Sequence, residues 1–582
     1  MVILIATSYL ANAQSRWQWG KRGGSPNEAL TLTEDDEYVV DMATDPAGNV
    51  YLLSIVQQDG FSPVNVAGHI VTGWGDAGQA VENILITSFK CDGTYRWSKD
   101  IGTNNSNYPV AIKTDTLGGV YITGTLSEGS STRHIDADTS WTSGSYQSMF
   151  LMKYDTAGHY KWFIYPQPDT LTELDVAFNP YTGVYDMDVD GGGNSYLLCD
   201  LEPGGYAGGS YVVTTEGTYI LKYDKNGIFI SGNHMQIING YPGCGLLMKK
   251  NPQNERYYIT VENLYGSAPS FGSISINHPM TVGCFNNSGS LLWLRQDTDP
   301  PSYYSAFGRP VIDKEDNVYL AGRASGSDTF NTYIMTNAGT YATAVPVIFK
   351  LDSNGNNIWG RNATINGFTN CNNITLNGSE VDIAGSYPGL LKWAGYADSL
   401  NLPINSDYHV FITRFNSNTG VIIGLDSAGS SSGINNGPTA MTSDKYGNFY
   451  VGGFLTDQLW VTLPTGIDTL TNFGGYSDFF VAKYGTANCT GAISLETPPE
   501  PGKFSITGIH VFPNPATDEL NITSVPQATS YRLLSITGTT QMQGPLQEGN
   551  NSLPVQRLAT GIYLLEMTGA DGARTIVRVV KE

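Results

Sequence analysis

One serine in this chain has the spacing of a catalytic nucleophile. Ser431 lies in the stretch GSSSG (429–433), which matches the Gly-x-Ser-x-Gly pattern of a nucleophile elbow. An elbow requires a strand before the serine and a helix after it, whereas the surrounding sequence DSAGSSSGINNGPT is rich in Ser, Gly and Asn. We therefore interpret this segment as a loop between structural repeats, and no catalytic residue is predicted.

Three aspartates at alternate positions could bind a cation. Asp186, Asp188 and Asp190 are followed by Asn194 in DMDVDGGGN, and oxygen ligands at such a spacing can hold Ca²⁺. However, alternate residues of a strand share a face, and the glutamate that closes an EF-hand loop is absent. We interpret the segment as a hairpin. Calcium on these three aspartates remains an alternative, and no other cofactor or metal is predicted.

Histidine and cysteine give no further site. The seven histidines show neither the His-Glu-x-x-His motif nor a paired spacing. The six cysteines form no Cys-x-x-Cys pair, which leaves zinc ribbons and thioredoxin-like redox sites unsupported. Six cysteines allow fifteen pairings and the spacing selects none, so disulfides and free packed thiols both stay open. Carboxylate pairs for glycoside chemistry cannot be judged, because they would come from distant segments.

A repeat explains where these residues lie. The segment DKEDNVYLAGR (313–323) places an Asp six residues before a Tyr, and the same frame recurs along the chain. A seventh copy has Leu376 and Asp382 at these positions. Successive copies are 70, 75, 61, 62, 63 and 68 residues apart. The other copies are Asp45–Tyr51, Asp115–Tyr121, Asp190–Tyr196, the degenerate Asn251–Tyr257 and Asp444–Tyr450.

Each copy predicts a β-hairpin, and a second hairpin follows it. The Asp begins a Gly/Asn turn between two apolar strands. About 25–35 residues later, segments such as MFLMKYDTAGHYKWF (149–163) predict a second hairpin, often with a Trp on its last strand. Two hairpins give four antiparallel strands in each repeat, as in a propeller blade. The last repeat lacks its fourth strand, which WQWGKRGG (17–24) can supply by alignment with YRWSKDIG (95–102).

These segments resemble the bacterial seven-bladed β-propeller repeat family, which alternates D-x-x-G-N-x-Y-x-x-G with D-x-F-x-x-K-[YF]. The last copy along the chain, at Asp444–Tyr450, matches best, with DKYGNFYVGGF and YSDFFVAKY, and the resemblance covers residues 17–489. It implies an all-β chain with a seven-bladed propeller of four antiparallel strands per blade, closed by an N-terminal strand. The resemblance implies no single activity.

Composition limits the partners. The chain has 53 acidic and 31 basic residues and a net charge of −22, which disfavours nucleic acid and anionic lipid. No stretch is apolar over the length of a membrane span. The N-terminus MVILIATSYLANAQS resembles a secretory signal peptide over 1–13, cleaved after Ala13, although a basic start is missing. A buried first strand is the alternative.

The C-terminal 79 residues form a separate predicted domain. A Pro-rich linker (491–503) follows the propeller (14–490), and residues 504–582 alternate as short strands in a small Ig-like β-sandwich. This segment resembles the type IX secretion C-terminal sorting domain through Asn514, Pro515, Gly561, Tyr563 and the basic residue Lys581. The resemblance implies passage through the Sec route and then the type IX machinery of a Gram-negative cell, with later cleavage. Arg578 and Lys581 are expected to offer exposed charge.

We therefore expect a secreted or cell-surface monomer that acts as a non-enzymatic binding or scaffolding module. Its ligand would be an extracellular glycan or protein, because aromatic residues are frequent in the connections between hairpins, unless these connections fold as strands that cover the blades. A propeller hydrolase or lyase acting on glycan or peptide is the alternative, and a surface-layer spacer is a third. The triplet Asp-Ser/Thr-aliphatic resembles a bacterial O-glycosylation acceptor and occurs at Thr116, Thr156, Thr170, Ser399, Ser427 and Thr469.

Overall fold

The computed structural model describes most of the chain. Strands joined by turns make up the described residues, no helix occurs among them, and the chain is all-β as the sequence predicts. None of the described segments is therefore a helix that could cross a membrane. The chain forms two compact units, Met1–Gly491 and Ala492–Glu582. The described residues are 15–26, 37–58, 63–72, 81–103, 107–126, 133–136, 139–141, 148–166, 168–169, 183–239, 245–251, 253–261, 269–298, 305–325, 329–335, 344–365, 369–397, 399–401, 408–430, 436–486, 489, 510–525, 529–535, 540–568 and 574–581.

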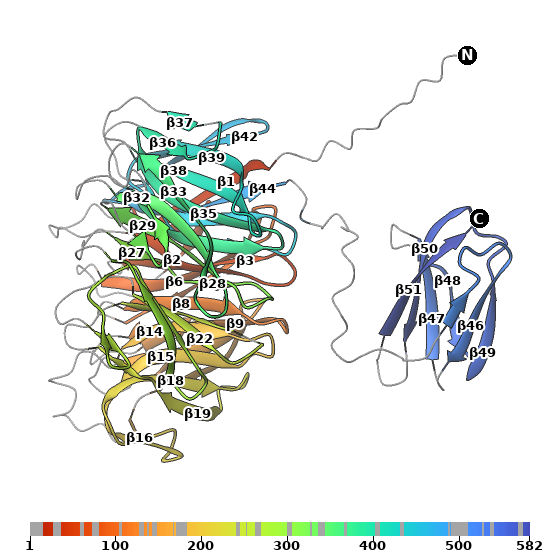
Figure 1. Cartoon of the computed structure of the whole chain (residues 1–582), viewed down its shortest axis with the longest axis horizontal. Helices are drawn as coiled ribbons and strands as arrows, with labels where there is room; N and C mark the ends of the chain where they lie inside the picture. The colour runs from red at the N-terminus through yellow and green to blue at the C-terminus, as the bar shows by residue number, and fades with distance from the viewer. Residues whose placement is uncertain are drawn as a thin grey trace. The chain divides into compact units, whose positions relative to one another are not determined.

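The larger unit contains seven sets of four consecutive antiparallel strands within its described part (Figure 1). Four sets are separate sheets, and three continue through a hairpin into sheets of six or seven strands. We call the seven sets sheets 1 to 7 in chain order and list their strands from the first to the fourth. Sheet 1 is β2 (Tyr38–Thr44), β3 (Val50–Gln58), β6 (Val81–Phe89) and β7 (Tyr95–Ile101). Sheet 2 is β8 (Tyr108–Thr114), β9 (Gly119–Leu126), β12 (Ser148–Asp155) and β13 (Tyr160–Ile164). Sheet 3 is β14 (Val184–Val189), β15 (Ser195–Leu201), β18 (Gly217–Tyr223) and β19 (Phe229–His234).

The remaining sheets repeat this order with local variations. Sheet 4 is β21 (Leu246–Lys250), β22 (Tyr257–Val261), β25 (Thr281–Phe285) and β26 (Leu291–Gln296). Sheet 5 has a divided first strand, β27 (Ala306–Phe307) and β28 (Val311–Ile312), followed by β29 (Val318–Ser325), β32 (Ala344–Leu351) and β33 (Asn357–Ile365). Sheet 6 is β34 (Asn370–Asn377), β35 (Glu380–Pro388), β38 (Tyr408–Asn416) and β39 (Ile422–Ser430). Sheet 7 is β40 (Gly437–Ser443), β41 (Phe449–Leu455), β44 (Asp478–Gly485) and β1 (Arg16–Gly24).

The first strands lie together at the centre of the large unit. β2 contacts β8, β8 contacts β14, and β14 contacts β21. In sheet 5, β27 contacts β22 of sheet 4 and β28 contacts β34, which in turn contacts β40. Because β40 also contacts β2, the succession of contacts returns to sheet 1.

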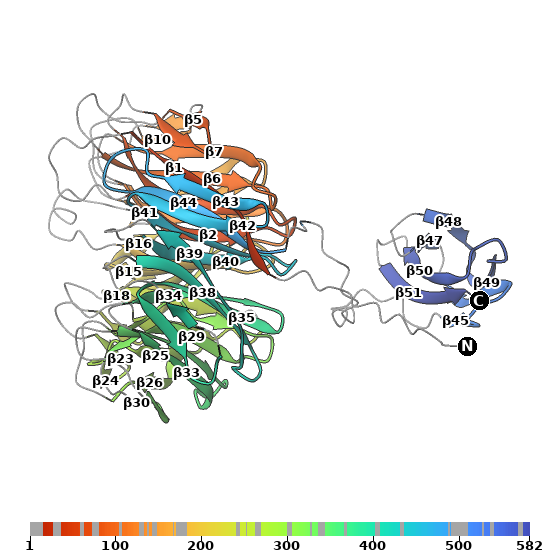
Figure 2. The same cartoon turned by 90° about the horizontal axis from the view of Figure 1, so that it is seen from above.

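The N-terminal strand completes the last sheet, as the sequence predicts. β1 pairs with β44 in antiparallel register, with Arg16 opposite Gly485 and Gly23 opposite Phe479 (Figure 2). The Trp19 indole donates to the Cys91 carbonyl of sheet 1 at 2.9 Å. The Trp17 indole donates to the Ser427 carbonyl of sheet 6 at 3.0 Å. One N-terminal strand thus links sheet 1 with sheets 6 and 7 at the other end of the large unit's sequence, and it covers an otherwise open edge.

The repeated Asp organises the turn between the first two strands. Asp45 Oδ1 accepts the backbone N–H groups of Ala47 and Asn49, both at 2.9 Å, and Oδ2 accepts the Tyr51 hydroxyl at 2.8 Å. Gly48 has a φ of 80°, which a glycine adopts without strain. The Tyr hydroxyl bond recurs in the pairs Asp115–Tyr121, Asp190–Tyr196, Asp313–Tyr319 and Asp444–Tyr450.

Sheet 4 departs from the predicted alignment. The Asn251 N–H donates to the Arg256 carbonyl five residues on, whereas Asp45 reaches Asn49 four residues on. This extra residue shifts the following strand by one position, which moves each side chain to the opposite face. Tyr258, and not Tyr257, therefore takes the place of the repeated Tyr. Its hydroxyl donates to Asp316 Oδ1 at 2.7 Å.

Tryptophans on the fourth strands hold neighbouring sheets together. Each indole N–H donates to a backbone carbonyl in the second hairpin of the next sheet, at 2.9–3.1 Å. The turn glycine beside the ring leaves no room for a side chain: a Cβ at Gly158 would lie 2.7 Å from the Trp97 ring. The donor–acceptor pairs are Trp19–Cys91, Trp97–Thr156, Trp162–Lys225, Trp293–Ser353 and Trp359–Ser417.

Small hairpins fill the connections between the second and third strands of all seven sheets. Each reaches back to the fourth strand of the preceding sheet or to the residues just after it, as β4 does when it pairs with β1. The connections between hairpins thus contain strands that cover the seams, which is the alternative that the sequence left open. The hairpins are β4 (Val64–Val66) with β5 (His69–Val71), β10 (Arg133–Asp136) with β11 (Thr139–Trp141), β16 (Gly204–Tyr206) with β17 (Tyr211–Val213), β23 (Ser270–Phe271) with β24 (Ile274–Ser275), β30 (Thr329–Phe330) with β31 (Tyr333–Ile334), β36 (Leu390–Trp393) with β37 (Ser399–Asn401), and β42 (Gln458–Leu463) with β43 (Gly466–Thr471); β20 (Ile237–Ile238) pairs with β23.

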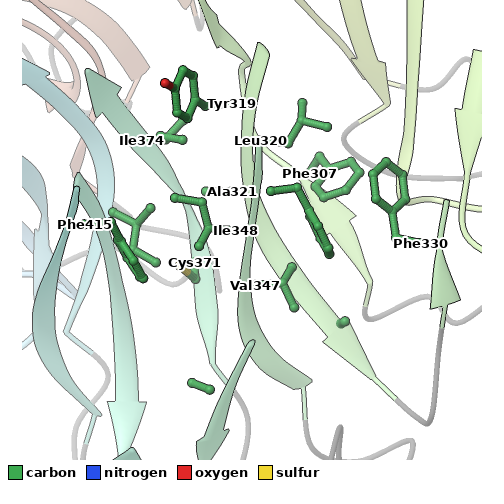
Figure 3. Packing of buried hydrophobic residues seen from close by; sticks show 14 of the residues in the cluster. Phe307, Tyr319, Leu320, Ala321, Phe330, Val347, Ile348, Cys371, Ile374 and Phe415 are labelled. Carbon is green, nitrogen blue, oxygen red and sulfur yellow. The ribbon is translucent and has the colours of Figure 1, made fainter. Parts of the chain in front are cut away.

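The hydrophobic core lies between sheets. Figure 3 shows Leu320 of β29 beside Phe307 and Phe330, while Ala321 points to the other face with Ile374. Both faces of such a strand are buried, so its apolar residues run without interruption, as in VYLAG.

The cysteines, whose pairing the sequence left open, comprise one disulfide and several free thiols among the described residues. Cys91 and Cys489 form a disulfide, and the buried Cys199, Cys284 and Cys371 are free; Cys244 lies outside the described residues.

The C-terminal unit consists of two sheets around one core. Leu520 and Ile522 of the first sheet and Leu533 and Leu565 of the second are fully buried in the same cluster. The first sheet has the order β45 (His510–Phe512), β46 (Glu519–Val525), β49 (Gly549–Pro554), and the second β48 (Thr540–Leu546), β47 (Thr529–Ser535), β50 (Gly561–Thr568), β51 (Arg574–Lys581).

Candidate functional site

An arginine connects distant first strands at the centre of the large unit. Arg309 lies between β27 and β28 of sheet 5. Its Nε donates to Asp186 Oδ2 at 2.8 Å and its Nη2 to Asp186 Oδ1 at 2.6 Å. Its Nη1 donates to Asp41 Oδ1 at 3.0 Å. One guanidinium therefore joins sheets 1, 3 and 5, through a bidentate charged hydrogen bond to Asp186 and a single one to Asp41.

The aspartates also bind the edges of neighbouring first strands. Asp186 Oδ2 accepts the Met248 N–H at 2.7 Å, and Asp188 Oδ2 accepts the Lys250 N–H at 2.9 Å, both on β21. Asp41 Oδ2 accepts the Ile112 N–H of β8 at 3.0 Å. These side chains satisfy edge amides that no further strand can reach.

Two lysines complete the group, which we call the central charge network: Asp41, Lys113, Asp186, Asp188, Lys249 and Arg309. Lys113 is ion-paired with Asp41, and Lys249 lies 2.9 Å from Asp188. Burial alone would raise the pKa of Asp41, but the Arg309 and Lys113 charges outweigh it and hold that pKa below its usual value. Burial and the nearby Arg309 charge lower the pKa of Lys113.

The network is therefore a set of satisfied charges. Asp186 is fully buried, and its two oxygens accept hydrogen bonds from Arg309 and two backbone amides. General acid–base catalysis needs a carboxyl group that can exchange a proton with a substrate near the working pH. The oxygens of Asp186 are already occupied by these donors, and the Arg309 and Lys113 charges lower the pKa of Asp41, so the arrangement favours cohesion of the central strands.

The three aspartates considered for calcium separate into different contacts. Asp186 and Asp188 belong to the central charge network, whereas Asp190 begins the turn of sheet 3 and accepts the Gly192 and Asn194 N–H groups at 3.0 Å. Over the part of the chain that the structure describes, no three His, Cys, Asp or Glu side chains gather in a group that could hold a metal ion. The spacing signal was thus a strand followed by a turn.

An aromatic cleft lies at the seam between sheets 2 and 3. We call it the seam cleft, and its volume is about 780 Å³. The fourth strand of sheet 2 and the residues after it form one side, and the β16–β17 hairpin and the end of sheet 3 form the other. Its aromatic lining consists of Tyr160, Phe163, Tyr165, Tyr206, Tyr223 and Phe229.

Asp169 is the charged side chain of the cleft lining, and it fixes the hairpin. Its carboxylate accepts the Gly208 N–H at 2.8 Å and the Gly209 N–H at 2.5 Å, and its own N–H donates to the Gly205 carbonyl. A ring pair, Phe163 and Tyr165, stands edge to face with centroids 4.7 Å apart. Flat rings in a fixed arrangement offer large apolar faces at low entropic cost.

Sheet 6 contains a buried carboxyl of a different kind. Asp382 occupies the place of the repeated Tyr, is 0 % exposed, and has no hydrogen-bond partner on either oxygen among the described residues. The nearest cation, Arg414, is 3.9 Å away and donates instead to Glu380. Burial raises the pKa of Asp382 well above its usual value.

Two buried acidic side chains, Glu37 and Asp478, lie where β1 meets β44. Glu37 is buried and accepts the Ser25 N–H at 2.9 Å, the Ser25 hydroxyl at 2.7 Å and the Gln57 N–H at 2.9 Å. Burial raises the pKa of Glu37 to about 8, and the nearby Asp478 charge adds to the effect. Burial also raises the pKa of Asp478 to about 7, although Arg22 is bonded to it at 3.1 Å.

The predicted modification and processing residues are scattered. Thr116, Ser399 and Thr469 are exposed, and Thr156 and Ser427 are half-buried. Thr116 and Thr156 lie in turns, and Ser427 and Thr469 lie on β39 and β43. Ala13, Thr170 and Ser431 lie outside the described residues.

In the C-terminal unit, Asn514 ties the first loop to the last strand. Its Nδ2 donates to the Arg578 carbonyl at 2.6 Å and its Oδ1 accepts the Val580 N–H at 2.8 Å. The Tyr563 hydroxyl donates to the Ala559 carbonyl at 2.8 Å, and Gly561 opens β50 opposite Lys581. Pro515 is exposed, as is Asn514.

The expectation that Lys581 offers exposed charge is wrong. Lys581 is 8 % exposed, because its strand β51 lies between β50 and the bridge from Ala516. Arg578 is exposed as expected.

Comparison with known proteins gives a family match for the C-terminal unit. Residues 510–582 match the family described as secretion system C-terminal sorting domain. The C-terminal unit carries a type IX sorting domain. This sorting domain implies an interaction with the type IX machinery and export to the cell surface or medium. No curated protein matches the chain.

Solved structures give only distant similarities. PorZ, a surface component of the type IX secretion system of Porphyromonas gingivalis, is 10% identical over 94% of this chain and 81% of its own, with a TM-score of 0.23. A europium-containing methanol dehydrogenase is 10% identical over 81% of this chain and 93% of its own, with a TM-score of 0.32. The structure of U3-55K is 9% identical over 66% of this chain and 97% of its own, with a TM-score of 0.33. Similarities at this level carry no inference about the ligand of this chain.

Proposed function

We propose that the large unit is a seven-bladed β-propeller that acts outside the cell as a non-enzymatic binding or scaffolding module. The seven four-stranded sheets, their Trp bonds from sheet to sheet and the return of contact from β40 to β2 support the propeller. The protein would enter the periplasm through the Sec route with a cleaved signal peptide, and the sorting domain would be removed after export. The mature protein would be a monomer that binds an extracellular glycan or protein.

The central charge network is the observation that carries this proposal. Charged residues from five sheets meet at the centre, where a propeller enzyme would gather its acids and bases. Here Asp41 and Asp186 are bonded to Arg309 at 3.0 Å and 2.6 Å. The charges therefore support the scaffold, while aromatic surface lies at the seam between two sheets.

Binding can be tested directly with the secreted protein. The mature form, purified from a host with the type IX machinery, is applied to an array of extracellular glycans and matrix proteins. We expect a defined set of retained ligands and no cleavage products by mass spectrometry. Turnover of an arrayed glycan or peptide that is lost in Asp186→Asn would instead establish the hydrolase or lyase alternative.

Export can be tested by transplanting the sorting domain. Residues 504–582 are fused to an unrelated periplasmic reporter in a host with the type IX machinery. We expect the reporter at the surface or in the medium, and the chain lacking these residues in the periplasm. A fused reporter that stays periplasmic while another cargo is exported would contradict the assignment.

A further inference from the structure

We propose that the seam cleft binds a neutral saccharide of a few sugar units, which rests on the proposed binding function and assigns it a site. The cleft is defined by the ring-lined seam between sheets 2 and 3. Its volume of about 780 Å³ falls within the range of small-molecule sites, roughly 300–1,000 Å³.

The aromatic lining supplies the faces that a sugar ring requires. Tyr160, Phe163, Tyr165 and Phe229 are half-buried, so each ring keeps part of its surface toward the cleft. Phe163 is held edge-on by Tyr165, and Phe229 by Tyr223 with centroids 5.6 Å apart. Rings fixed in this way can pack against the C–H faces of a pyranose without a further loss of side-chain freedom.

Polar groups at the cleft are few and uncharged, apart from Asp169. Tyr223 is 6 % exposed and lines the cleft, so its hydroxyl is one of the polar groups of the wall. A phenolic hydroxyl can both donate to and accept from a sugar hydroxyl. Ser210 is exposed at the hairpin side and offers a second hydroxyl.

The electrostatics of the cleft select against charged ligands. No Lys, Arg or His stands among the described residues that line it, and the chain as a whole carries a net charge of −22, so an anionic glycan is disfavoured. The single carboxylate, Asp169, is already bonded to two backbone amides at 2.8 Å and 2.5 Å. It is therefore less available to pair with a basic peptide.

The test uses the secreted protein and defined probes. Neutral trisaccharides of glucose and of N-acetylglucosamine, with trilysine and trigalacturonate as charged probes, are titrated by calorimetry and by ligand-observed NMR. We expect a neutral trisaccharide to bind, Tyr165→Ala to weaken it at least tenfold, and Tyr223→Phe to weaken it several-fold. Tyr95→Ala, which removes a ring stacked on His69 in sheet 1, should leave affinity unchanged.

The outcomes separate the site from the function. Array ligands that bind equally well to Tyr165→Ala and Tyr223→Phe would overturn the seam cleft while the binding function stands. Preferential binding of trilysine or trigalacturonate at the cleft would overturn the neutral saccharide. Retained thermal midpoints of the variants exclude loss of folding as the cause, and Tyr165→Phe, which keeps the ring, should restore affinity.

Discussion

The centre of the large unit and its seam cleft use polar and aromatic residues in opposite ways. At the centre, Arg309 brings together carboxylates from sheets 1 and 3, and each carboxylate has several partners. At the seam, half-buried rings line a cavity together with the Tyr223 side chain and few other polar groups. Charged groups that are fully satisfied hold a structure together, whereas ring faces left partly exposed on a fixed wall are the ones that a ligand can engage.

Breaking the centre should have the largest effect. Arg309→Met removes the cation and leaves Asp41 and Asp186 buried without their partner, so we expect the free energy of unfolding to fall by about 3–5 kcal/mol. Denaturant unfolding of the secreted protein measures it. Tyr165→Ala at the seam is the matched control and should cost less, about 1–2 kcal/mol, because this half-buried ring loses its contact with Phe163. Equal losses for both variants would contradict the distinction between the two regions.

The free energy of unfolding should depend on pH through the two buried acids Glu37 and Asp478. Burial raises the pKa of Glu37 from 4.5 to about 8, so the folded state keeps a proton that the unfolded state releases between these values. The stabilisation is complete below about pH 4.5 and is lost as pH rises through about 8; Asp478, with a pKa of about 7, acts in the same direction. We expect a loss of about 4 kcal/mol from Glu37 between about pH 5 and pH 9, and Asp478 adds to it.

Glu37→Gln is the variant that checks this assignment. Because the amide does not titrate, the unfolding free energy of Glu37→Gln should depend much less on pH over the same range. The exposed variant Asp169→Asn should keep the slope of the unchanged protein. Parallel curves for the unchanged protein and Glu37→Gln would show that another group is responsible.

Asp382 sharpens the comparison, because it is buried like the central aspartates but lacks their partners. We expect Asp382→Asn to stabilise the protein by about 1–2 kcal/mol at pH 8, since an amide avoids the cost of an unsatisfied buried carboxylate. Asp186→Asn at the centre should do the reverse. Thermal melting of both variants decides the matter, and a destabilised Asp382→Asn would mean that Arg414 satisfies this carboxyl in solution.

The smallest expected effect lies in the sorting domain. Asn514→Ala removes two exposed hydrogen bonds to β51, and we expect a loss of about 1 kcal/mol in its own unfolding. Hydrogen exchange at Val580, whose N–H is bonded to Asn514, should accelerate. Exchange that stays unchanged there would show that the last strand does not depend on this contact.

The sequence by itself determined the local units of this protein. The Asp-to-Tyr frame predicts a turn in which both ends lie within seven residues, and the bonds of Asp45 to Asn49 and Tyr51 bear this out. The fourth strand of sheet 7 was also predictable, because residues 17–24 keep the pattern of their equivalents. Only in sheet 4 did the frame mislead, since one added residue in the turn moves Tyr258 into the place expected for Tyr257.

The tertiary structure alone decided the contacts between units. Arg309 and Asp41 are 268 positions apart, and Cys91 and Cys489 are 398 apart, and no local pattern marks such pairs. The seam cleft likewise combines residues of two sheets and a hairpin whose strands are only three residues long. Periodicity reports which residues share a face within one strand. It carries no information on which distant strand that face will meet, and the burial of Lys581 and the charge network at the centre depend on that meeting.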